Sequence, residues 1–183
     1  MGLQGTQDVL YRNEGDGQFS DVTQISGVSQ ANRYYGLGVI PSDYDLDGDQ
    51  DLFVANDETP NVLFQNQGDG TFRDVGLIAG VAYNGDGDAE AGMGVDFGDY
   101  DNDGDPDLYV THFFTETNTL YRNEGGRFTD VTTSARLAAP TVDLLGWGTR
   151  FFDHDNDGLL DLFVANGHVY PHVDRIETGS TYP

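Results

Sequence analysis

The segment DYDNDGDPD, residues 99–107, decides the fold, because two close copies occur as DYDLDGDQD at 43–51 and DHDNDGLLD at 153–161. All three follow the pattern D-x-D-x-D-G-x-x-D. Carboxylates at positions 1, 3, 5 and 9 can converge on one hard cation, and glycine at position 6 permits the sharp turn that this convergence requires. Without a cation, four or five carboxylates within nine residues repel one another at neutral pH. The pattern therefore predicts three loops that bind calcium.

Each loop is expected to bind one Ca²⁺, so we predict about three sites. A helix–loop–helix calcium site needs glutamate at position 12, but that position is Val54, Val110 or Val164 in an apolar run. The loops are therefore expected within β-hairpins. At position 7 the third loop has Leu159, which can ligate only through its carbonyl oxygen, so we expect main-chain ligation at this position in all three. The predicted metal-binding residues are Asp43, Asp45, Asp47, Asp49, Asp51, Asp99, Asp101, Asp103, Asp105, Asp107, Asp153, Asp155, Asp157, Leu159 and Asp161.

Two other interpretations fit the loops less well. Aspartate, asparagine and glycine gather in turns because they tolerate turn geometry, but this explains one Asp-Gly pair rather than three nine-residue copies. Magnesium keeps its waters and takes few protein ligands, so it suits the pattern less than calcium does.

The rest of the chain repeats with the same period. The segment LYRNEGDGQFSDVT at 10–23 recurs as LFQNQGDGTFRDV at 63–75 and as LYRNEGGRFTDVT at 120–132. A Gly-x-Gly pair precedes each acidic loop, at Gly36/Gly38, Gly92/Gly94 and Gly146/Gly148. Such self-similarity is typical of repeat folds. We therefore treat 1–183 as one repeat region, with approximate units at 8–60, 61–117 and 118–183.

Each unit predicts four short strands, which in the first unit cover residues 10–12, 19–23, 37–40 and 52–55. The run LFVA at 52–55 is apolar without alternation, which favours a strand covered on both faces. The Gly-x-Gly pairs are expected to allow a bulge or close strand packing. Four strands in roughly 54 residues match one blade of a β-propeller. The predicted fold is all-β, with three four-stranded antiparallel blades.

The composition excludes several classes of partner and site. Eight Lys+Arg against 32 Asp+Glu give a formal charge of -24, which disfavours nucleic acid and anionic membranes as partners. Three calcium ions would leave about -18. The chain has no cysteine, so disulfides and thiolate metal sites are excluded. No apolar run approaches the length of a membrane helix, and no signal-peptide pattern begins the sequence.

The segment GMGVDFGDY at 92–100 resembles the name-giving stretch of the FG-GAP/VCBS repeat family, whose calcium-binding blades also form integrin α-chain propellers. The segments GWGTRFFD at 146–153 and LFVANGHV at 162–169, with the repeated LYRNEG…FxDV, resemble acidic extracellular proteins that carry an ASPIC/UnbV domain. This resemblance implies a β-propeller, usually of seven blades. It also implies export, to a secreted, periplasmic or cell-surface location, and a binding or scaffolding role.

The chain departs from the family in two ways. Three units fall short of the four to eight blades that close a propeller, and no ASPIC/UnbV domain follows Pro183. We therefore expect a fragment of a larger propeller protein. The alternative is association of several copies into a closed ring through open blade edges.

Two functions remain as hypotheses. The first is a non-enzymatic, calcium-stabilised scaffold that recognises a protein or glycan ligand. The second is a carbohydrate-active enzyme, a polysaccharide hydrolase or lyase, that uses loop carboxylates or the His168/His172 pair. Catalytic carboxylate pairs are singular, whereas these carboxylates recur three times, which favours the scaffold. Pro171 argues against a helical zinc site at the two histidines, so a loop is expected there.

Overall fold

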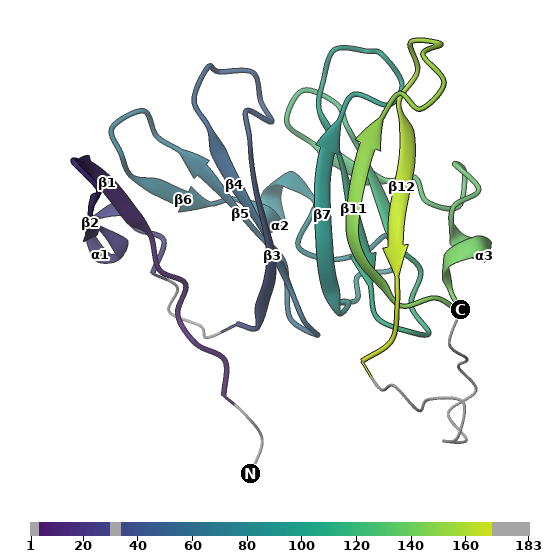
Figure 1. The fold of residues 1–183 in the computed structure, drawn as a ribbon, viewed down its shortest axis with the longest axis horizontal. Helices are drawn as coiled ribbons and strands as arrows, with labels where there is room; N and C mark the ends of the chain where they lie inside the picture. The colour runs from purple at the N-terminus through teal and green to yellow at the C-terminus, as the bar shows by residue number, and fades with distance from the viewer. Residues whose placement is uncertain (1–3, 30–33, 170–183) are drawn as a thin grey trace.

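The computed structural model describes residues 4–29 and 34–169, which form strands β1 to β12 and three one-turn helices (Figure 1). The strands are β1 (Tyr11–Gly15), β2 (Gln18–Asp21), β3 (Gly36–Ser42), β4 (Asp51–Asn56), β5 (Val62–Asn66), β6 (Phe72–Asp74), β7 (Gly92–Gly98), β8 (Asp107–His112), β9 (Thr119–Asn123), β10 (Phe128–Asp130), β11 (Gly146–Phe152) and β12 (Asp161–Asn166). The helices are α1 (Thr23–Ser26), α2 (Gly76–Ala79) and α3 (Ala138–Thr141).

The strands form antiparallel sheets that follow one another along the chain. Two sheets have four strands, in the orders β3-β4-β5-β6 and β7-β8-β9-β10, and two have only a pair, β1-β2 and β11-β12. In Figure 1 the β1-β2 pair lies at the purple end of the row and the β11-β12 pair at the yellow-green end. The predicted all-β fold with four-stranded antiparallel blades is confirmed.

The boundaries of the sheets do not coincide with the boundaries of the repeat units taken from the sequence. Each complete sheet begins with the Gly-x-Gly strand and ends with the strand that contains Phe-x-Asp. The sequence unit 8–60 therefore supplies β1 and β2 to one sheet and β3 and β4 to the next. Within the described ranges, three sequence units yield two complete sheets and two half-sheets.

The Gly-x-Gly pairs perform both of the roles expected of them. The pairing of β3 with β4 shifts register between Gly36 and Gly38, and the same irregularity recurs in the β7-β8 and β11-β12 pairs. A Cβ atom on Gly38 would lie 2.2 Å from the carbonyl oxygen of Met93, and one on Gly94 would lie 1.7 Å from that of Trp147. Glycine is required because the first strand of each sheet passes so close to the first strand of the next.

The core lies between successive sheets. One buried cluster joins Phe53 and Leu63 of the first complete sheet to Leu108, Val110 and Tyr121 of the second. Full burial of such a side chain contributes about 1.5–3 kcal/mol. Strands β4 and β8 are almost wholly buried, which confirms the prediction of strands covered on both faces. The equivalent strand β12 is largely exposed, because no further sheet of the described residues covers it.

Short helical turns connect the sheets where the sequence predicted only strands. The strand expected over 19–23 ends at Asp21, whose carboxylate accepts a hydrogen bond from the amide of Thr23 at the start of α1. Gly80 directly follows helix α2, and a Cβ atom there would lie 2.6 Å from the carbonyl oxygen of Phe128 in the following sheet. One turn is too short to produce a 3.6-residue period, so the pattern gave no signal for it.

Candidate calcium loops

The three acidic loops share one backbone conformation. Each joins the first two strands of a sheet, β3 to β4, β7 to β8 and β11 to β12. At position 4 the residue is left-handed in every copy, with φ of 58°, 59° and 63° at Leu46, Asn102 and Asn156. At position 6 the glycine has φ of 96°, 100° and 89°. Left-handed backbone disfavours most side chains, so its recurrence at the same positions indicates one shared loop geometry.

Carboxylates at positions 1 and 5 stabilise this loop conformation by accepting hydrogen bonds from backbone amides of the same loop. In the second loop Asp99 accepts hydrogen bonds from the amides of Asp103 and Gly104, both at 3.0 Å. Asp103 in turn accepts one from the amide of Asp105 at 2.9 Å. Two of these bonds recur in the other two loops. There too, the amide at position 6 donates to the carboxylate at position 1, and the amide at position 7 donates to the carboxylate at position 5.

The position 9 carboxylate attaches the loop to the third strand of its sheet. Asp107 accepts hydrogen bonds from the amide of Asn123 at 2.8 Å and from the amide of Tyr100 at 3.1 Å. Asp51 makes the equivalent bonds to Asn66 and Tyr44 at 2.8 and 3.3 Å. Both carboxylates are buried, and burial raises the pKa of each to about 6. A bound cation would favour their charged form instead.

Positions 1, 3 and 9 converge in the first two loops. Oxygen atoms of Asp43, Asp45 and Asp51 all lie within 4.8 Å of one another, and Asp99, Asp101 and Asp107 form the same group. In the first loop, Oδ1 of Asp43 and Oδ1 of Asp45 are buried without a hydrogen-bond partner. Buried carboxylate oxygens require a partner, and a divalent cation shared between them meets that requirement.

The side chains at positions 5 and 7 are not part of these two groups. At position 5, Asp47 and Asp103 accept the amides of their own loops. At position 7, Asp105 Oδ2 accepts a hydrogen bond from the amide of Gly125 at 2.8 Å, in the turn between β9 and β10. The Asp105 side chain therefore faces the turn between β9 and β10, and main-chain ligation at position 7 stays a prediction.

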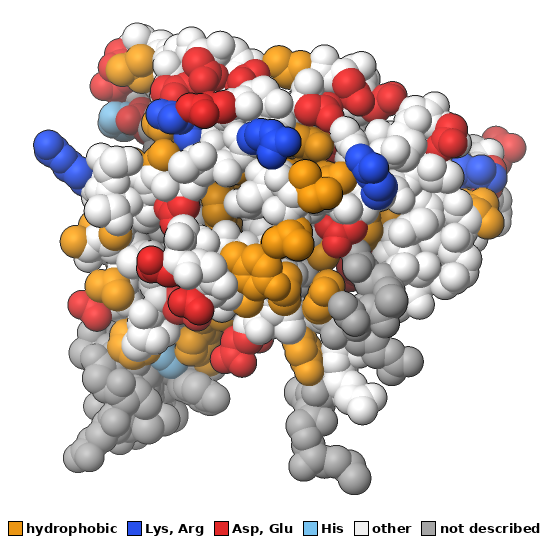
Figure 2. Space-filling view, turned by 180° about the vertical axis from the view of Figure 1, so that it is seen from behind, with side chains coloured by type: hydrophobic (Ala, Val, Ile, Leu, Met, Phe, Trp, Pro, Cys, Tyr) orange, Lys and Arg blue, Asp and Glu red, His pale blue; other side chains and the backbone are white. Residues whose placement is uncertain are grey.

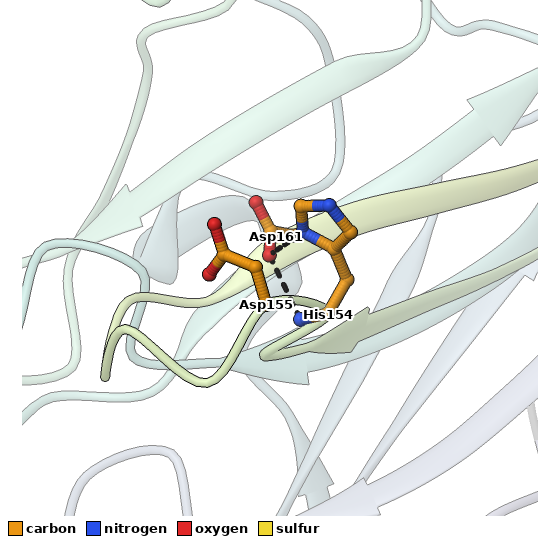
Figure 3. Close-up of side chains that lie close together, drawn as sticks. All are labelled: His154, Asp155 and Asp161. Carbon is orange, nitrogen blue, oxygen red and sulfur yellow. Dashed lines mark hydrogen bonds and ion pairs between the residues drawn. The ribbon is translucent and has the colours of Figure 1, made fainter.

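The third loop differs because His154 stands where the other two have tyrosine. Figure 3 shows the imidazole directed at Asp161, with its Nδ1 2.6 Å from Oδ2 of the carboxylate. The backbone amide of His154 donates to the same oxygen at 2.9 Å. The hydrogen bond to Asp161 raises the pKa of His154, and the bonds from the His154 amide and ring lower the pKa of Asp161.

This pairing changes which carboxylates gather in the third loop. Positions 1, 3 and 5 converge there, at Asp153, Asp155 and Asp157, while Asp161 instead groups with His154 and Asp155. The side chains of His154 and Asp161 are 60% and 42% exposed, so the loop lacks the burial of the other two position 9 carboxylates.

Asn123 links the first loop to the second complete sheet, a role that sequence reasoning missed. Its side-chain amide donates to the carbonyl oxygens of Tyr44 at 2.8 Å and Pro106 at 3.0 Å. The Tyr44 ring packs against Phe128 with 5.9 Å between ring centroids. The available signal was the asparagine that recurs as Asn13, Asn66 and Asn123 in the repeated Leu-aromatic segment.

A cleft of about 250 Å³ opens beside the first loop, between the two complete sheets. Its lining includes Tyr44, Asp45, Gln65, Arg73 and Arg127. Figure 2 shows basic side chains, all arginine because the sequence has no lysine, in a row beneath a band of acidic groups on the face that it presents. The cleft thus combines both charges close to a candidate metal loop.

Of the three histidines besides His154, one is in the core, one lies near the end of the described residues and one lies outside them. His112 is wholly buried, and its Nδ1 donates to the carbonyl oxygen of Thr117 at 2.8 Å. Its Nε2 lies 3.6 Å from Oε2 of Glu90, and burial lowers the pKa of His112 to about 4. His168 lies beside the Phe113 ring, whereas His172 is outside the described residues, so their expected loop stays a prediction.

None of the helices within 4–29 and 34–169 has the length and apolar character needed to cross a membrane. Residues 43–110, which span the first two loops, match the family model described as an FG-GAP-like repeat.

Three curated relatives, each named Cartilage acidic protein 1, align with most of the chain. The protein from Xenopus tropicalis is 33% identical over 123 residues, 63% of this chain and 17% of its own length. Those from Mus musculus and Homo sapiens are 32% and 30% identical over 80% of this chain. The chain spans about a fifth of the length of these relatives. The predicted likeness to FG-GAP repeat proteins, and to an acidic protein of the ASPIC/UnbV type, is confirmed.

Proposed function

We propose that this chain is a calcium-stabilised, non-enzymatic β-propeller segment that works outside the cell as a scaffold for recognition of a protein or glycan. The observation that carries the proposal is the convergence of carboxylates at positions 1, 3 and 9 in two loops that share left-handed backbone at positions 4 and 6. The wider propeller, of which these sheets would be part, and self-association through open sheet edges belong to the same proposal.

Calcium suits these loops because its ligands are oxygen atoms held in a flexible geometry. Asp43, Asp45 and Asp51 would hold it in the first loop, and Asp99, Asp101 and Asp107 in the second, with position 7 contributing its carbonyl. In the third loop Asp153, Asp155 and Asp157 are the corresponding group. The ion would neutralise repulsion among carboxylates that the hydrogen bonds of each loop bring together.

Calcium would also connect the loop to the rest of the sheet. Asp107 bonds to the amide of Asn123, and the Asn123 side chain bonds to Tyr44 of the preceding loop. An ion that fixes Asp107 would therefore restrain a hydrogen-bonded path between neighbouring sheets. Such a scaffold is expected to gain stability with metal concentration, because the native state binds the ion and the unfolded chain does not.

The proposed extracellular location follows from the metal and from the relatives. Calcium loops of modest affinity fill where calcium is millimolar, as it is outside cells. The relatives are named Cartilage acidic protein 1, after an extracellular tissue and an acidic character, and this chain too is acidic, with a formal charge of -24.

The cleft beside the first loop is the proposed recognition surface. Arg73 and Arg127 line it near Asp45, so a ligand there would meet guanidinium groups and a metal loop together. Guanidinium groups bind carboxylates and other planar anions in a defined geometry. The surface is therefore suited to an acidic peptide or an acidic glycan.

The test is a calorimetric calcium titration of metal-stripped protein, with magnesium as the control ion. We expect about three calcium sites, one for each loop, with magnesium binding more weakly. Thermal unfolding in calcium and in chelator accompanies the titration, and the melting temperature is expected to fall when calcium is removed. Absence of calcium binding by a folded protein would refute the proposal.

A further inference from the structure

Gln65 on β5 connects the first acidic loop to an arginine on the neighbouring strand. Its Nε2 donates to Oδ2 of Asp45 at 2.7 Å, and its Oε1 accepts a hydrogen bond from Nη2 of Arg73 at 3.2 Å. Gln65 and Arg73 are direct partners in the β5-β6 pairing, so their side chains lie on the same face of the sheet. One amide group therefore contacts both a candidate calcium ligand and a basic side chain.

Only one orientation of this amide satisfies both of its neighbours. A glutamine side chain has one oxygen that accepts and one nitrogen that donates. If the amide were reversed, its oxygen would face the Asp45 carboxylate, which accepts only, and its nitrogen would face the Arg73 guanidinium, which donates only. An ionised Asp45 that stays in place therefore holds Gln65 with its oxygen directed at Arg73.

Calcium at the first loop would keep Asp45 both ionised and in place. Oδ1 of Asp45 is buried without a hydrogen-bond partner, and the carboxylate converges with those of Asp43 and Asp51. An ion that satisfies Oδ1 leaves Oδ2 to Gln65. Without the ion, the carboxylates of the loop repel one another and become alternative partners for the guanidinium of Arg73. Calcium removes both disturbances.

Arg73 and Arg127 together supply the positive charge of the cleft beside the first loop. Arg12, Arg122 and Arg150 form ion pairs with carboxylates, whereas neither cleft arginine does so within the described ranges. The chain has 32 acidic residues against eight basic ones, so acidic partners are abundant. Two guanidinium groups that line one cleft without a carboxylate partner are suited to an anion from outside the chain.

The remaining lining favours an acidic peptide over an acidic glycan. Ile78 of α2 lines the cleft and is 69% exposed. Tyr44, the aromatic residue of the lining, is only 4% exposed, so it offers no ring face on which a sugar could stack. An exposed apolar side chain beside two guanidinium groups matches a peptide that combines carboxylates with apolar side chains.

The second loop is built differently at the equivalent positions. Arg122 takes the place of Gln65 and Thr129 that of Arg73, as the β9-β10 pairing shows. Arg122 forms its ion pair with Glu124 of its own hairpin. All residues that line the cleft lie between 44 and 127, in the two complete sheets and their connections. The glutamine bridge is therefore a property of the first loop and of the junction between these two sheets.

We propose that the cleft binds a carboxylate of an acidic peptide between Arg73 and Arg127, and that calcium at the first loop strengthens this binding through Gln65. The inference rests on the calcium scaffold proposed above and adds a ligand class and its regulation. Gln65 is a positioning residue, because it acts on the peptide through Arg73. Coupling between two binding sites is reciprocal, so the peptide raises the calcium affinity of the first loop by the same factor.

Fluorescence anisotropy of a labelled Glu-Leu-Glu-Glu-Leu-Glu peptide with the 183-residue chain tests the binding. We expect binding in calcium that the matched Lys-Leu-Lys-Lys-Leu-Lys peptide does not show. Arg73→Gln and Arg127→Gln should each weaken it several-fold. The control is Arg136→Gln, which removes the same charge outside the cleft and should leave the affinity unchanged. No binding by the wild type in calcium, or an equal loss in Arg136→Gln, overturns the inference.

Gln65→Ala tests the coupling without a change of charge. The wild type should bind the peptide about tenfold more tightly in calcium than in chelator, below the melting temperature of the calcium-free protein. In Gln65→Ala this factor should fall to about twofold, the part due to neutralised charge, which salt screens. Gln67→Ala, which removes an exposed glutamine of the same hairpin, should keep the wild-type factor. An unchanged factor in Gln65→Ala overturns the coupling.

Calorimetric calcium titration of the same samples separates this inference from the proposed function. Calcium binding by a chain that ignores the peptide overturns the inference alone and leaves the calcium scaffold standing. A folded chain that binds the peptide but no calcium refutes the scaffold and the coupling. A hyaluronan fragment that binds the cleft where the peptide does not overturns the choice of a peptide ligand. A merely structural role for Gln65 would lower stability in Gln65→Ala without changing the peptide's dependence on calcium.

Discussion

Asp96 on β7 forms an ion pair with Arg150 on β11, with 2.9 Å between carboxylate Oδ1 and guanidinium Nη1. The second carboxylate oxygen accepts a hydrogen bond from the amide of Phe151 at 2.7 Å. Asp96 and Arg150 occupy the same repeat position in successive sheets, four residues after the first glycine of the Gly-x-Gly pair, where the first sheet has Ile40. One junction between sheets is therefore apolar and the next is polar.

Replacing the carboxylate should cost more than replacing its cationic partner. Asp96 is buried while the Arg150 side chain is 73% exposed, so Asp96→Ala leaves the Phe151 amide unsatisfied and should destabilise by about 1–3 kcal/mol. Arg150→Ala should cost less than about 1 kcal/mol, as exposed ion pairs do. Urea unfolding in calcium measures both, with Asp143→Ala as an exposed control. Equal losses of unfolding free energy in the two variants would mean that the hydrogen bond from the Phe151 amide is not the main contribution of Asp96 to stability.

Removal of one position 3 carboxylate should remove one calcium site. Asp45→Ala and Asp101→Ala each take a ligand from a converging group, so the calorimetric count should fall from about three to about two. Asp155→Ala should do the same in the third loop. Asp86→Ala, an aspartate in the 82–92 loop outside the repeats, is the matched control and should leave the count unchanged. A count of three in any of the position 3 variants would refute that ligand.

The sequence predicted the repeated elements well because each of them has a characteristic local sequence pattern that recurs in every copy. The bulge at Gly38, the left-handed glycine at Gly48 and the buried strand at 52–55 are local properties that recur, so repetition separated them from chance. The contact of Asn123 with Tyr44 is different, because it joins residues 79 apart in the chain and depends on how one sheet packs on the next. No local pattern encodes that distance.

The difference in the third loop also required three-dimensional structure. His154 replaces a tyrosine whose amide makes the same bond to position 9, so the sequence gave no reason to expect that its ring would also take Asp161. The phase of the sheets was hidden for a related reason. Repetition fixes the period of the units but not which strands of neighbouring units pair.

Asn123→Ala should destabilise more than Asn66→Ala, although the two asparagines are equivalent in the repeat. Asn123 donates to Tyr44 and Pro106 and is fully buried, whereas Asn66 donates only to Gln50 within its own sheet. Loss of the buried bonds should cost about 1–3 kcal/mol, and Asn66→Ala about half of that. Chemical unfolding in calcium provides both values. Similar costs would show that the bond between sheets adds no stability.

The stability should fall on acidification because of His112. Burial lowers its pKa to about 4 from an ordinary 6.5, so the unfolded chain binds the proton first as the pH falls. Between pH 6.5 and about 4 the unfolded state holds more protons, and the free energy of unfolding decreases towards the lower pH. From pH 6.5 to 5 the decrease should be about 2 kcal/mol at most, since one proton changes stability by about 1.4 kcal/mol per pH unit.

His112→Asn isolates this effect. Asparagine is the residue at the equivalent end of β4, where the backbone amide of Asn56 donates to Oδ1 of Asn61 as the backbone amide of His112 donates to Oδ1 of Asn118. Glu90 and Glu116 lie near His112 with pKa values raised by burial, and Asp130 acts on it through its charge, so they influence the pH dependence of both proteins. The difference between wild type and His112→Asn, measured by urea unfolding in saturating calcium at pH 6.5 and 5, should therefore report the histidine. A difference that does not change between these pH values would show that His112 takes up its proton equally in the folded and unfolded chain.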